Sequence, residues 1–445
     1  MPVVKDEILK RARENKVEFV NLQFVDILGK AKSVTIPISK LDNAIESNIW
    51  FDGSSVEGFV RISESDMYLK PDIETFCVIP WETNERYSVA RIICDVHTPG
   101  GEPFQGDPRF VLKQMLGKAA EKGLIYNTGP ELEFFLFEDT DSDNLKSLFH
   151  DRAGYFDLTL DRAQKVRQEI TLALQAMNID VEALHHEASA SQHEIDFKYD
   201  NALATADKAI TLKFVVREIA KKHGLKATFM PKPIEGINGS GMHVHQSLFQ
   251  GDKNAFFNSE DRYSLSDLAK YFIAGQLHYI KEICAVTNPT VNSYKRIVPG
   301  YEAPVYICWG SRNRSALMRI PAYTKGRERA VRCELRCPDP SANVYLAFAL
   351  MLGAGLKGIE QKMPLSEPVE ENIYHCDENF FEKKHISFLP SSLHESLEIF
   401  KNSSFCKEIL GEYIFNNYIT AKEKEWDSYR LSVSQWEKDR YLNNY

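Results

Sequence analysis

Three short segments of the chain place charged or metal-binding side chains two residues apart. These segments contain Glu131 with Glu133, His243 with His245, and Arg332 with Glu334 and Arg336. Because successive side chains of a β-strand alternate between its faces, each set would line one face of a sheet. Carboxylates bind divalent cations, and arginines bind phosphates and carboxylates through paired hydrogen bonds. The three sets therefore predict a polar pit that holds metal ions and phosphate groups.

The local sequence favours β-strands at these positions. The acidic pair lies in PELEFFLFE (130–138) and the arginines lie in RCELRC (332–337), which are β-favourable contexts. Glu187 and Glu194, in HHEASASQHE, add two carboxylates. The glycines of NGSGMHVH (238–245) would let backbone N–H groups approach an anion closely. Neither a Walker A ending nor a GxGxxG after a strand is found, so a dinucleotide fold is unsupported.

Composition limits the kind of partner. The 445 residues predict two domains, and the net charge of −9 argues against a nucleic-acid partner. Arginines are concentrated between residues 296 and 336, which favours a small anionic ligand. The eight scattered cysteines contain no CxxC pair, and the charged start of the chain has no signal-peptide pattern. We therefore expect a cytoplasmic protein that contacts neither nucleic acid nor membrane.

The predicted elements divide the chain near residue 100. A helix-like start is followed by strand-like runs up to residue 97, and Thr98–Asp107 is the best linker candidate. Pro108 stands where a helix would begin, and strands then alternate with helices. The segment Leu393–Tyr445 is predicted to be helical throughout.

Nine motifs, in order along essentially the whole chain, resemble those of bacterial type I glutamine synthetases of the short, non-adenylylated subclass. They are FDGSSVEGF, ESDMYLKPD, GPELEFFLF, GYFDL, HHE with QHEIDF, MPKP with NGSGMHVH, NSYKRIVPGYEAP, SRNRSALMRIP and RCELRCPDPSANVYL. The resemblance implies an α+β fold, with an N-terminal β-grasp domain over residues 1–104. A catalytic domain over residues 105–445 would contain a curved antiparallel sheet flanked by helices. It also implies a dodecamer of two hexameric rings, with active sites between subunits.

The resemblance also implies a reaction, in which ammonia is ligated to L-glutamate at the expense of ATP through a γ-glutamyl phosphate. Two divalent ions, Mg²⁺ or Mn²⁺, would be bound in each active site, one by Glu133, Glu187 and Glu194 and the other by Glu131, His243 and Glu334. The implied glutamate-binding residues are Asn238, Gly239, Arg296 and Arg336. The implied ATP-binding residues are Glu182, His245, Ser247, Arg314 and Arg332.

The remaining implied roles concern catalysis, ammonium and regulation. Arg314 and Arg319 would act on the transferred phosphate, and Glu302 would close the site. Ammonium would be bound by Asp52 of a neighbouring subunit with Ser55, Tyr155 and Glu187. Arg61 matches a residue associated with glutamine feedback, and the C-terminal tail is a possible docking site for a nitrogen-regulator protein, although ring-to-ring packing is the favoured role.

Several positions depart from the family pattern. Ser191 replaces a usual glycine, so it would cost about 1 kcal/mol if the position needs a positive φ. Glu235 replaces an aromatic residue and Ala153 replaces a glycine. The proline-rich sequence that follows an adenylylated tyrosine is missing after Tyr374, so we expect no such modification. Arg312 and Arg327 are expected to form surface ion pairs.

Three other functions would share part of this sequence pattern. A glutamate–polyamine ligase would share the metal and ATP residues but need a different amine pocket. A catalytically silent nitrogen sensor should have lost metal ligands, whereas all six are present here. A guanidino kinase with a related sheet would leave the DGSS loop unexplained.

Overall fold

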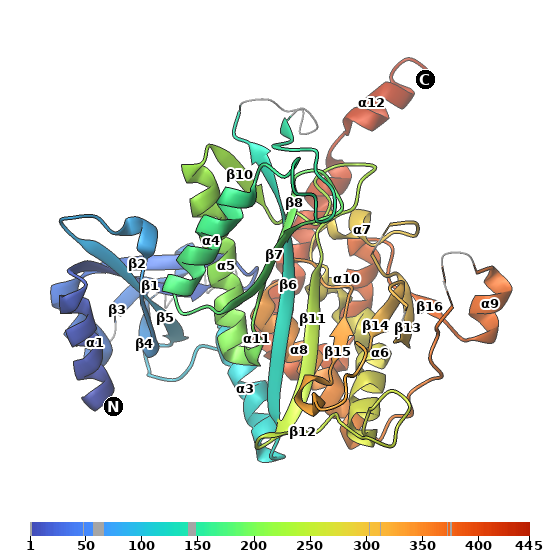
Figure 1. Cartoon of the computed structure of the whole chain (residues 1–445), viewed down its shortest axis with the longest axis horizontal. Helices are drawn as coiled ribbons and strands as arrows, with labels where there is room; N and C mark the ends of the chain where they lie inside the picture. The colour runs from blue at the N-terminus through green and yellow to red at the C-terminus, as the bar shows by residue number, and fades with distance from the viewer. Residues whose placement is uncertain are drawn as a thin grey trace.

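The computed structural model describes residues 2–47, 49–56, 66–140, 148–301, 303–311, 313–371, 373 and 376–445. Figure 1 shows a small N-terminal unit beside a larger unit, whose long central strands lie in front of a layer of helices. None of the helices in these ranges is long and apolar enough to cross a bilayer.

The N-terminal unit is a five-stranded mixed sheet in the order β2-β1-β5-β4-β3. Its strands are β1 (Val17–Val25), β2 (Ala31–Pro37), β3 (Ile49–Asp52), β4 (Asp66–Val78) and β5 (Ser88–His97). β1 and β5 are parallel, and the other neighbours are antiparallel. Helices α1 (Pro2–Glu14) and α2 (Leu41–Ser47) contribute Ile8, Ala12, Leu41 and Ala44 to the core of this unit.

The predicted linker leads into a helix that begins at the expected residue. α3 spans Pro108–Glu121, with Asp107 as its N-cap. One oxygen of Asp107 accepts from Arg109 N (2.9 Å) and the other from Val96 N (3.0 Å), so the cap also fixes the end of β5. Proline is favoured here because the first N–H groups of a helix have no partner within it.

A buried arginine connects the two units. Arg109, on α3, donates to Asp95 on β5 (2.7 Å), to Asp72 on β4 (2.7 Å) and to both oxygens of Asp207 on α5 (Ala202–Lys222). Tyr345 also donates to Asp207 (2.6 Å). Because the guanidinium is 97% buried, its charge is balanced by these carboxylates and not by water.

The larger unit contains an eleven-stranded sheet in the order β16-β13-β14-β15-β11-β6-β8-β7, with β9 and β10 paired to β6 and β12 to β11. Its strands are β6 (Ile125–Glu138), β7 (Val181–His186), β8 (Gln192–Phe197), β9 (Asp200–Asn201), β10 (Leu225–Thr228), β11 (Met242–Gln250), β12 (Lys253–Asn254), β13 (Tyr306–Gly310), β14 (Ala316–Arg319), β15 (Cys333–Leu335) and β16 (Ser387–Phe388). The expected antiparallel pairing needs one correction, because β13 and β14 are parallel. β15 is also shorter than expected, so Arg332 and Arg336 flank it.

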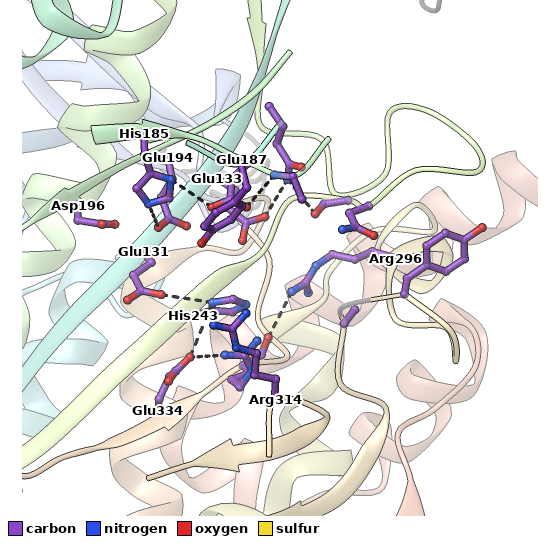
Figure 2. Close-up of a pocket in the computed structure, with 18 of the residues that line it drawn as sticks. Glu131, Glu133, His185, Glu187, Glu194, Asp196, His243, Arg296, Arg314 and Glu334 are labelled. Atoms are coloured by element: carbon purple, nitrogen blue, oxygen red, sulfur yellow. Dashed lines mark hydrogen bonds and ion pairs between the residues drawn. The ribbon is translucent and has the colours of Figure 1, made fainter. Parts of the chain in front are cut away.

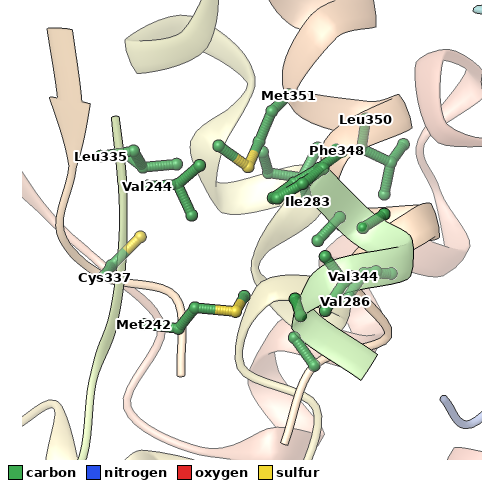
Figure 3. Packing of buried hydrophobic residues seen from close by; sticks show 14 of the residues in the cluster. Met242, Val244, Ile283, Val286, Leu335, Cys337, Val344, Phe348, Leu350 and Met351 are labelled. Carbon is green, nitrogen blue, oxygen red and sulfur yellow. The ribbon is translucent and has the colours of Figure 1, made fainter. Parts of the chain in front are cut away.

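Side-chain alternation along β11 separates the core from the polar face. Met242 and Val244 are fully buried and face α6 (Asp267–Thr287) and α8 (Val344–Glu360), where Ile283 and Phe348 pack (Figure 3). His243 and His245 therefore point to the opposite face of the sheet. The apolar residues between the predicted polar ones thus fix the direction in which the polar ones point.

The remaining helices cover the sheet and form the C-terminal part. They are α4 (Gln164–Ala176), α7 (Ser293–Arg296), α9 (Glu378–Lys383), α10 (Leu393–Lys401), α11 (Ser404–Leu431) and α12 (Gln435–Tyr441). The prediction of helix throughout Leu393–Tyr445 is confirmed except at the short breaks between these helices and at Gly411, whose φ of 75° interrupts α11. α12 extends away from the body of the molecule (Figure 1).

Candidate active site

A polar cavity of about 590 Å³ opens on the sheet face that carries the predicted residues. Its lining combines carboxylates, histidines and arginines from six strands, from α7 and from the loops between these elements (Figure 2). The lining residues that the sequence predicted are Glu131, Glu133, Tyr155, Glu187, Glu194, Asn238, Gly239, His243, Arg296, Arg314, Arg319, Glu334 and Arg336. Segments that are up to about two hundred residues apart in the chain therefore meet in one place.

Strand register explains this convergence. Glu131 on β6 is paired with His243 on β11, and Glu133 is paired with Glu194 on β8. His245 is in turn paired with Glu334 on β15. Cross-strand partners point to the same face, so these pairings gather side chains of the three predicted sets.

The first group of potential metal ligands consists of Glu131, His243 and Glu334. His243 Nδ1 lies 3.3 Å from Glu131 Oε2 and 3.8 Å from Glu334 Oε1. Burial favours the neutral form of Glu131, but hydrogen bonds from His243 and His245 outweigh it and hold its pKa well below the usual range. Burial is likewise outweighed at Glu334, because His245, Arg336 and His243 lie close to its carboxylate and lower its pKa. Both carboxylates are therefore ionised at neutral pH.

The second group consists of His185, Glu187 and Glu194. His185 Nδ1 lies 3.4 Å from Glu187 Oε1, and its Nε2 lies 3.2 Å from Glu194 Oε1. Glu133 lines the same cavity, but its Oε2 accepts from Gln192 Nε2 and Gly241 N, both at 2.9 Å. His185 was not predicted from the sequence, although its spacing of two residues from Glu187 is the same as in the predicted sets.

Asp196 was not predicted from the sequence either. It lies two residues after Glu194 on β8, lines the cavity and has a buried Oδ1 without a hydrogen-bond partner. Burial and the charge of Glu131 raise the pKa of Asp196 to about 7. Burial, Asp196 and Glu133 raise the pKa of Glu194 well above its usual value. Carboxylates that repel one another in this way are stabilised by a bound cation, so these residues fit a metal site.

The types of donor limit the ion. Both groups are mainly carboxylate with one imidazole each, and the described cysteines do not line the cavity. Hard divalent ions such as Mg²⁺ and Mn²⁺ prefer oxygen ligands, whereas structural zinc favours cysteine and histidine.

A third group, Asp151, His186 and His193, lies behind the second and is fully buried. Arg167 donates to His193 Nδ1 (2.8 Å), which places a fixed positive charge where a cation would bind. His186 contacts Asp151 Oδ1 through Nε2 (2.9 Å) and the carbonyl of Glu187 through Nδ1 (2.6 Å), so both ring nitrogens donate. The hydrogen bonds of this group therefore stabilise the β7–β8 hairpin, and the group does not resemble a metal site.

Ser191 is hydrogen-bonded to the same group. Its φ is 60°, so the position does need the left-handed conformation that the sequence analysis considered. The hydroxyl accepts from Asp151 N (3.2 Å) and donates to Asp151 O (3.3 Å), and Ser191 N donates to Asp151 Oδ1 (3.1 Å). The two hydroxyl hydrogen bonds, which glycine would lack, thus offset the backbone cost of serine.

Arginines form the opposite wall of the cavity. Arg319 and Arg336 donate to the two oxygens of Glu334, at 2.8 and 2.7 Å. Arg296 is buried and donates to the carbonyls of residues 336–338, so it also fixes the wall. A Cβ at Gly241 would lie 2.5 Å from Arg296 Nη2, which explains the glycine.

Except for Arg314, which lines the cavity, the predicted nucleotide residues lie outside the cavity lining. His245 Nδ1 accepts from Arg332 Nε (3.0 Å), so its Nε2 carries the proton and donates to Glu131 Oε1 (2.7 Å). Ser247 lies on the same face of β11 and is buried. Glu182 is exposed on β7, and its negative charge favours the protonated form of the Arg332 guanidinium.

The predicted ammonium residues are divided between the two units. Tyr155 lines the cavity and is 50% exposed, and burial with the charge of Glu187 raises its pKa to about 12. Asp52 ends β3 in the N-terminal unit, is exposed and is absent from the cavity lining. Ser55 follows in a short 3-10 turn, Gly53–Ser55. This chain alone therefore does not bring Asp52 to Tyr155.

Some predicted residues lie outside the described part of the chain, namely Arg61, Glu302, Arg312 and Tyr374. Among the other positions singled out in the sequence, Arg327 and Glu235 are exposed and Ala153 is buried.

Comparisons with known proteins cover nearly the whole chain. The glutamine synthetase catalytic domain matches residues 105–441, and the glutamine synthetase beta-grasp domain matches residues 16–99. Similar chains include the glutamine synthetases of Methanosarcina mazei (51% identity over 99% of this chain and 98% of that one) and Clostridium saccharobutylicum (49% identity, 99% of each). Among solved structures, a GmaS/ADP complex has a TM-score of 0.89 at 31% identity, covering 98% of this chain and 99% of that one. Plasmodium falciparum glutamine synthetase has a TM-score of 0.87 at 28% identity, covering 98% of each.

Proposed function

The chain belongs to the glutamine synthetase family, and on that premise we propose that the described cavity is where its three substrates react. The fold is α+β, with a β-grasp domain and a catalytic domain. The enzyme is a glutamate–ammonia ligase that forms L-glutamine from L-glutamate, ammonium and ATP. The observation that carries our assignment of the site is the convergence of two carboxylate–histidine groups and four arginines on one cavity.

The arginines are assigned to the phosphoryl transfer. The γ-phosphoryl group of ATP passes to the side-chain carboxylate of glutamate, and ammonia then displaces phosphate from the acyl phosphate. Transfer of this kind depends on positioning and charge neutralisation, because the protein need not form a covalent bond. We assign Arg314 and Arg319 to the transferred phosphate and Arg332 to ATP, with Glu182, His245 and Ser247 on the nucleotide side. The similarity to a solved ADP complex supports a nucleotide site in this fold.

The family uses divalent metal ions, and we propose two Mg²⁺ or Mn²⁺ ions for each site. Glu131, His243 and Glu334 would hold one ion, and Glu133, Glu187 and Glu194 would hold the other, near His185. The ions would supply charge neutralisation for the phosphates. The raised pKa of Glu194 supports this proposal, because a bound cation would relieve the repulsion that causes it.

Glutamate is assigned to the end of the cavity lined by Asn238, Gly239, Arg296 and Arg336. A guanidinium fork is suited to the planar carboxylate of an amino acid. Tyr155 and Glu187 would contact ammonium, and Glu302 would shield the acyl phosphate from water.

The ammonium pocket would be completed by Asp52 and Ser55 of a neighbouring subunit, in a dodecamer of two hexameric rings. Two observations support an assembly with shared sites. Asp52 is exposed and lies outside the lining of its own chain's cavity. The segment after Tyr155 also exposes apolar side chains that water would not favour, including Phe156 at 68% and Leu158 at 78%.

Subunit mixing tests this assignment. Asp52→Ala and Glu131→Gln would each be inactive alone, but in a mixed oligomer an intact Asp52 of one subunit would meet an intact Glu131 of another. We expect activity to appear in hybrids isolated by two different affinity tags. Inactive hybrids of confirmed composition would show that each chain builds its own site.

Three further proposals concern feedback regulation, a protein partner and the location in the cell. We propose that Arg61 mediates glutamine feedback, which unchanged glutamine inhibition of Arg61→Ala would contradict. A nitrogen-regulator protein is a possible partner of the C-terminal tail, where Trp436 and Leu442 are exposed. A cytoplasmic location is supported by the eight cysteines, all of which are free thiols.

A further inference from the structure

Lys232 is a buried cation directly behind the glutamate end of the cavity. It is 92% buried and is absent from the cavity lining. Its ammonium lies 3.7 Å from the centre of the Tyr301 ring, and Tyr301 lines the cavity. The same ammonium donates a short hydrogen bond to the carbonyl of Ile237, the residue before Asn238. One group therefore contacts both a wall side chain and the backbone of the wall next to it.

The backbone of Lys232 is fixed as firmly as its ammonium. Asn292 accepts from Lys232 N (2.7 Å) through its amide oxygen and donates to Lys232 O (3.0 Å) through its amide nitrogen. Ser240 N donates to Pro231 O (2.8 Å), which closes the loop that carries Asn238 and Gly239. The loop is thus held at Lys232 by Asn292 and at Ser240 by the Pro231 carbonyl, and between these points the Lys232 ammonium holds the carbonyl of Ile237.

Packing against Lys232 leaves little freedom in this loop. A Cβ at Gly239 would lie 2.1 Å from Pro231 O and 3.3 Å from Lys232 Cδ. Arg296 Cγ would lie at 3.3 Å from the same position. The backbone of Gly239 is therefore packed against the Pro231 carbonyl, the Lys232 stem and the buried arginine.

A cation at this position has a cost that a purely packing role would not explain. Burial and the charge of Arg296 lower the pKa of Lys232. An apolar side chain of similar length would fill the same space without that cost. The lysine is instead stabilised by the Ile237 carbonyl and by the face of the Tyr301 ring, which attracts cations.

We propose that Lys232 is a positioning residue for glutamate, which orients the Ile237–Gly239 backbone and the Tyr301 ring as two walls of the substrate pocket. The inference rests on the proposed placement of glutamate beside Asn238, Gly239 and Arg296. The lysine acts through these walls and does not touch the reacting atoms. Its loss therefore affects the binding of glutamate more than the binding of ATP.

The test compares the KM values for glutamate and ATP in Lys232→Met, which keeps an unbranched side chain of similar length and removes its charge. We expect the KM for glutamate to rise at least about fivefold, while the KM for ATP stays within about twofold. Equal rises in both constants, or no rise for glutamate, would overturn the proposal. Thermal unfolding and oligomer size are measured in parallel to detect a general loss of structure.

Variants of Tyr301, whose ring contacts the Lys232 ammonium, keep the proposal testable if Lys232→Met does not fold. Tyr301→Phe keeps the ring face and Tyr301→Leu removes it, so the KM for glutamate should rise more in the leucine variant. Equal constants in the two Tyr301 variants would overturn the proposal. In a double-mutant cycle, Lys232→Met should have less effect when Tyr301 is already leucine, and full additivity would contradict the contact.

A separate variant distinguishes failure of this inference from failure of the proposed site. Arg336→Lys tests the placement of glutamate without altering Lys232. If Arg336→Lys raises the KM for glutamate but Lys232→Met does not, only the role of Lys232 is wrong. If neither variant raises it, the glutamate placement is wrong, and the inference fails with it.

Discussion

His243 and Glu131 are direct cross-strand partners on β11 and β6, with His243 Nδ1 3.3 Å from Glu131 Oε2. A second histidine, His245, donates to the other oxygen of the same glutamate. Glu131 thus interacts with two imidazoles of one strand, which stabilise its ionised form before any cation binds. It contacts His243, of the first group of potential metal ligands, and His245, which we assign to the nucleotide side of the sheet.

The first prediction concerns the negative charge of Glu131. Glu131→Gln should weaken the binding of Mn²⁺ and reduce kcat/KM at least about a hundredfold, because an amide is a weaker ligand than a carboxylate. Isothermal titration with Mn²⁺ and a steady-state assay measure the two effects. Glu121→Gln, at the exposed end of α3, is the matched control. Unchanged Mn²⁺ affinity in Glu131→Gln would remove Glu131 from the metal site.

The second prediction concerns the serine at φ 60°. Ser191→Ala keeps the backbone cost and loses both hydroxyl hydrogen bonds to Asp151, so it should destabilise the protein by about 1–2 kcal/mol. Ser191→Gly loses the same hydrogen bonds but regains about 1 kcal/mol of backbone freedom, so it should be the more stable of the two. Chemical denaturation measures the difference. An alanine variant as stable as the glycine variant would show that the backbone at this position is not strained.

The third prediction is a pH dependence of stability. Lys213 on α5 is buried, and burial with the charge of Arg217 lowers its pKa to about 7. The unfolded chain keeps this lysine protonated up to about pH 10.4, so between these values it binds more protons than the folded protein. The penalty is therefore full below pH 7 and disappears as the pH approaches 10.4.

Lys213→Met should accordingly raise the free energy of unfolding by about 2 kcal/mol at pH 7, with a smaller gain at pH 10. Thermal unfolding of both proteins across this range provides the measurement. A gain that does not change with pH would mean that packing, and not the lysine charge, causes it.

The fourth prediction separates two arginines of the same wall. Arg336→Lys would remove the two-point contact to the glutamate carboxylate that we propose for Arg336, and it should raise the KM for glutamate about tenfold. Arg314→Lys should mainly lower kcat, because its assigned interaction strengthens as the phosphoryl group is transferred. Initial rates at varied glutamate and ATP distinguish the two. A lower kcat in Arg336→Lys together with a higher KM for glutamate in Arg314→Lys would contradict the roles that we assign to the two arginines.

Spacing along single strands made most of the site predictable. Alternation placed Glu131 and His243 on one face, and the apolar Met242 and Val244 on the other. Asp196 lies two residues after Glu194 on β8 and so has the spacing of the predicted sets, and alternation places it on the same face. The parallel pairing of β13 and β14 could not be predicted in this way, because it depends on contacts between strands that local spacing does not reveal. The proposed meeting of Asp52 and Tyr155 involves two subunits, so neither one sequence nor one chain could establish it.

The measurement that tests the central claim most directly is product formation from glutamate and ATP with Mg²⁺ or Mn²⁺, with ammonium or putrescine as the amine. Mass spectrometry identifies the product, and Glu131→Gln is assayed beside the unaltered protein. We predict glutamine with ammonium, no adduct with putrescine, and loss of product in Glu131→Gln. A putrescine adduct in place of glutamine, or full glutamine formation by Glu131→Gln, would contradict the account.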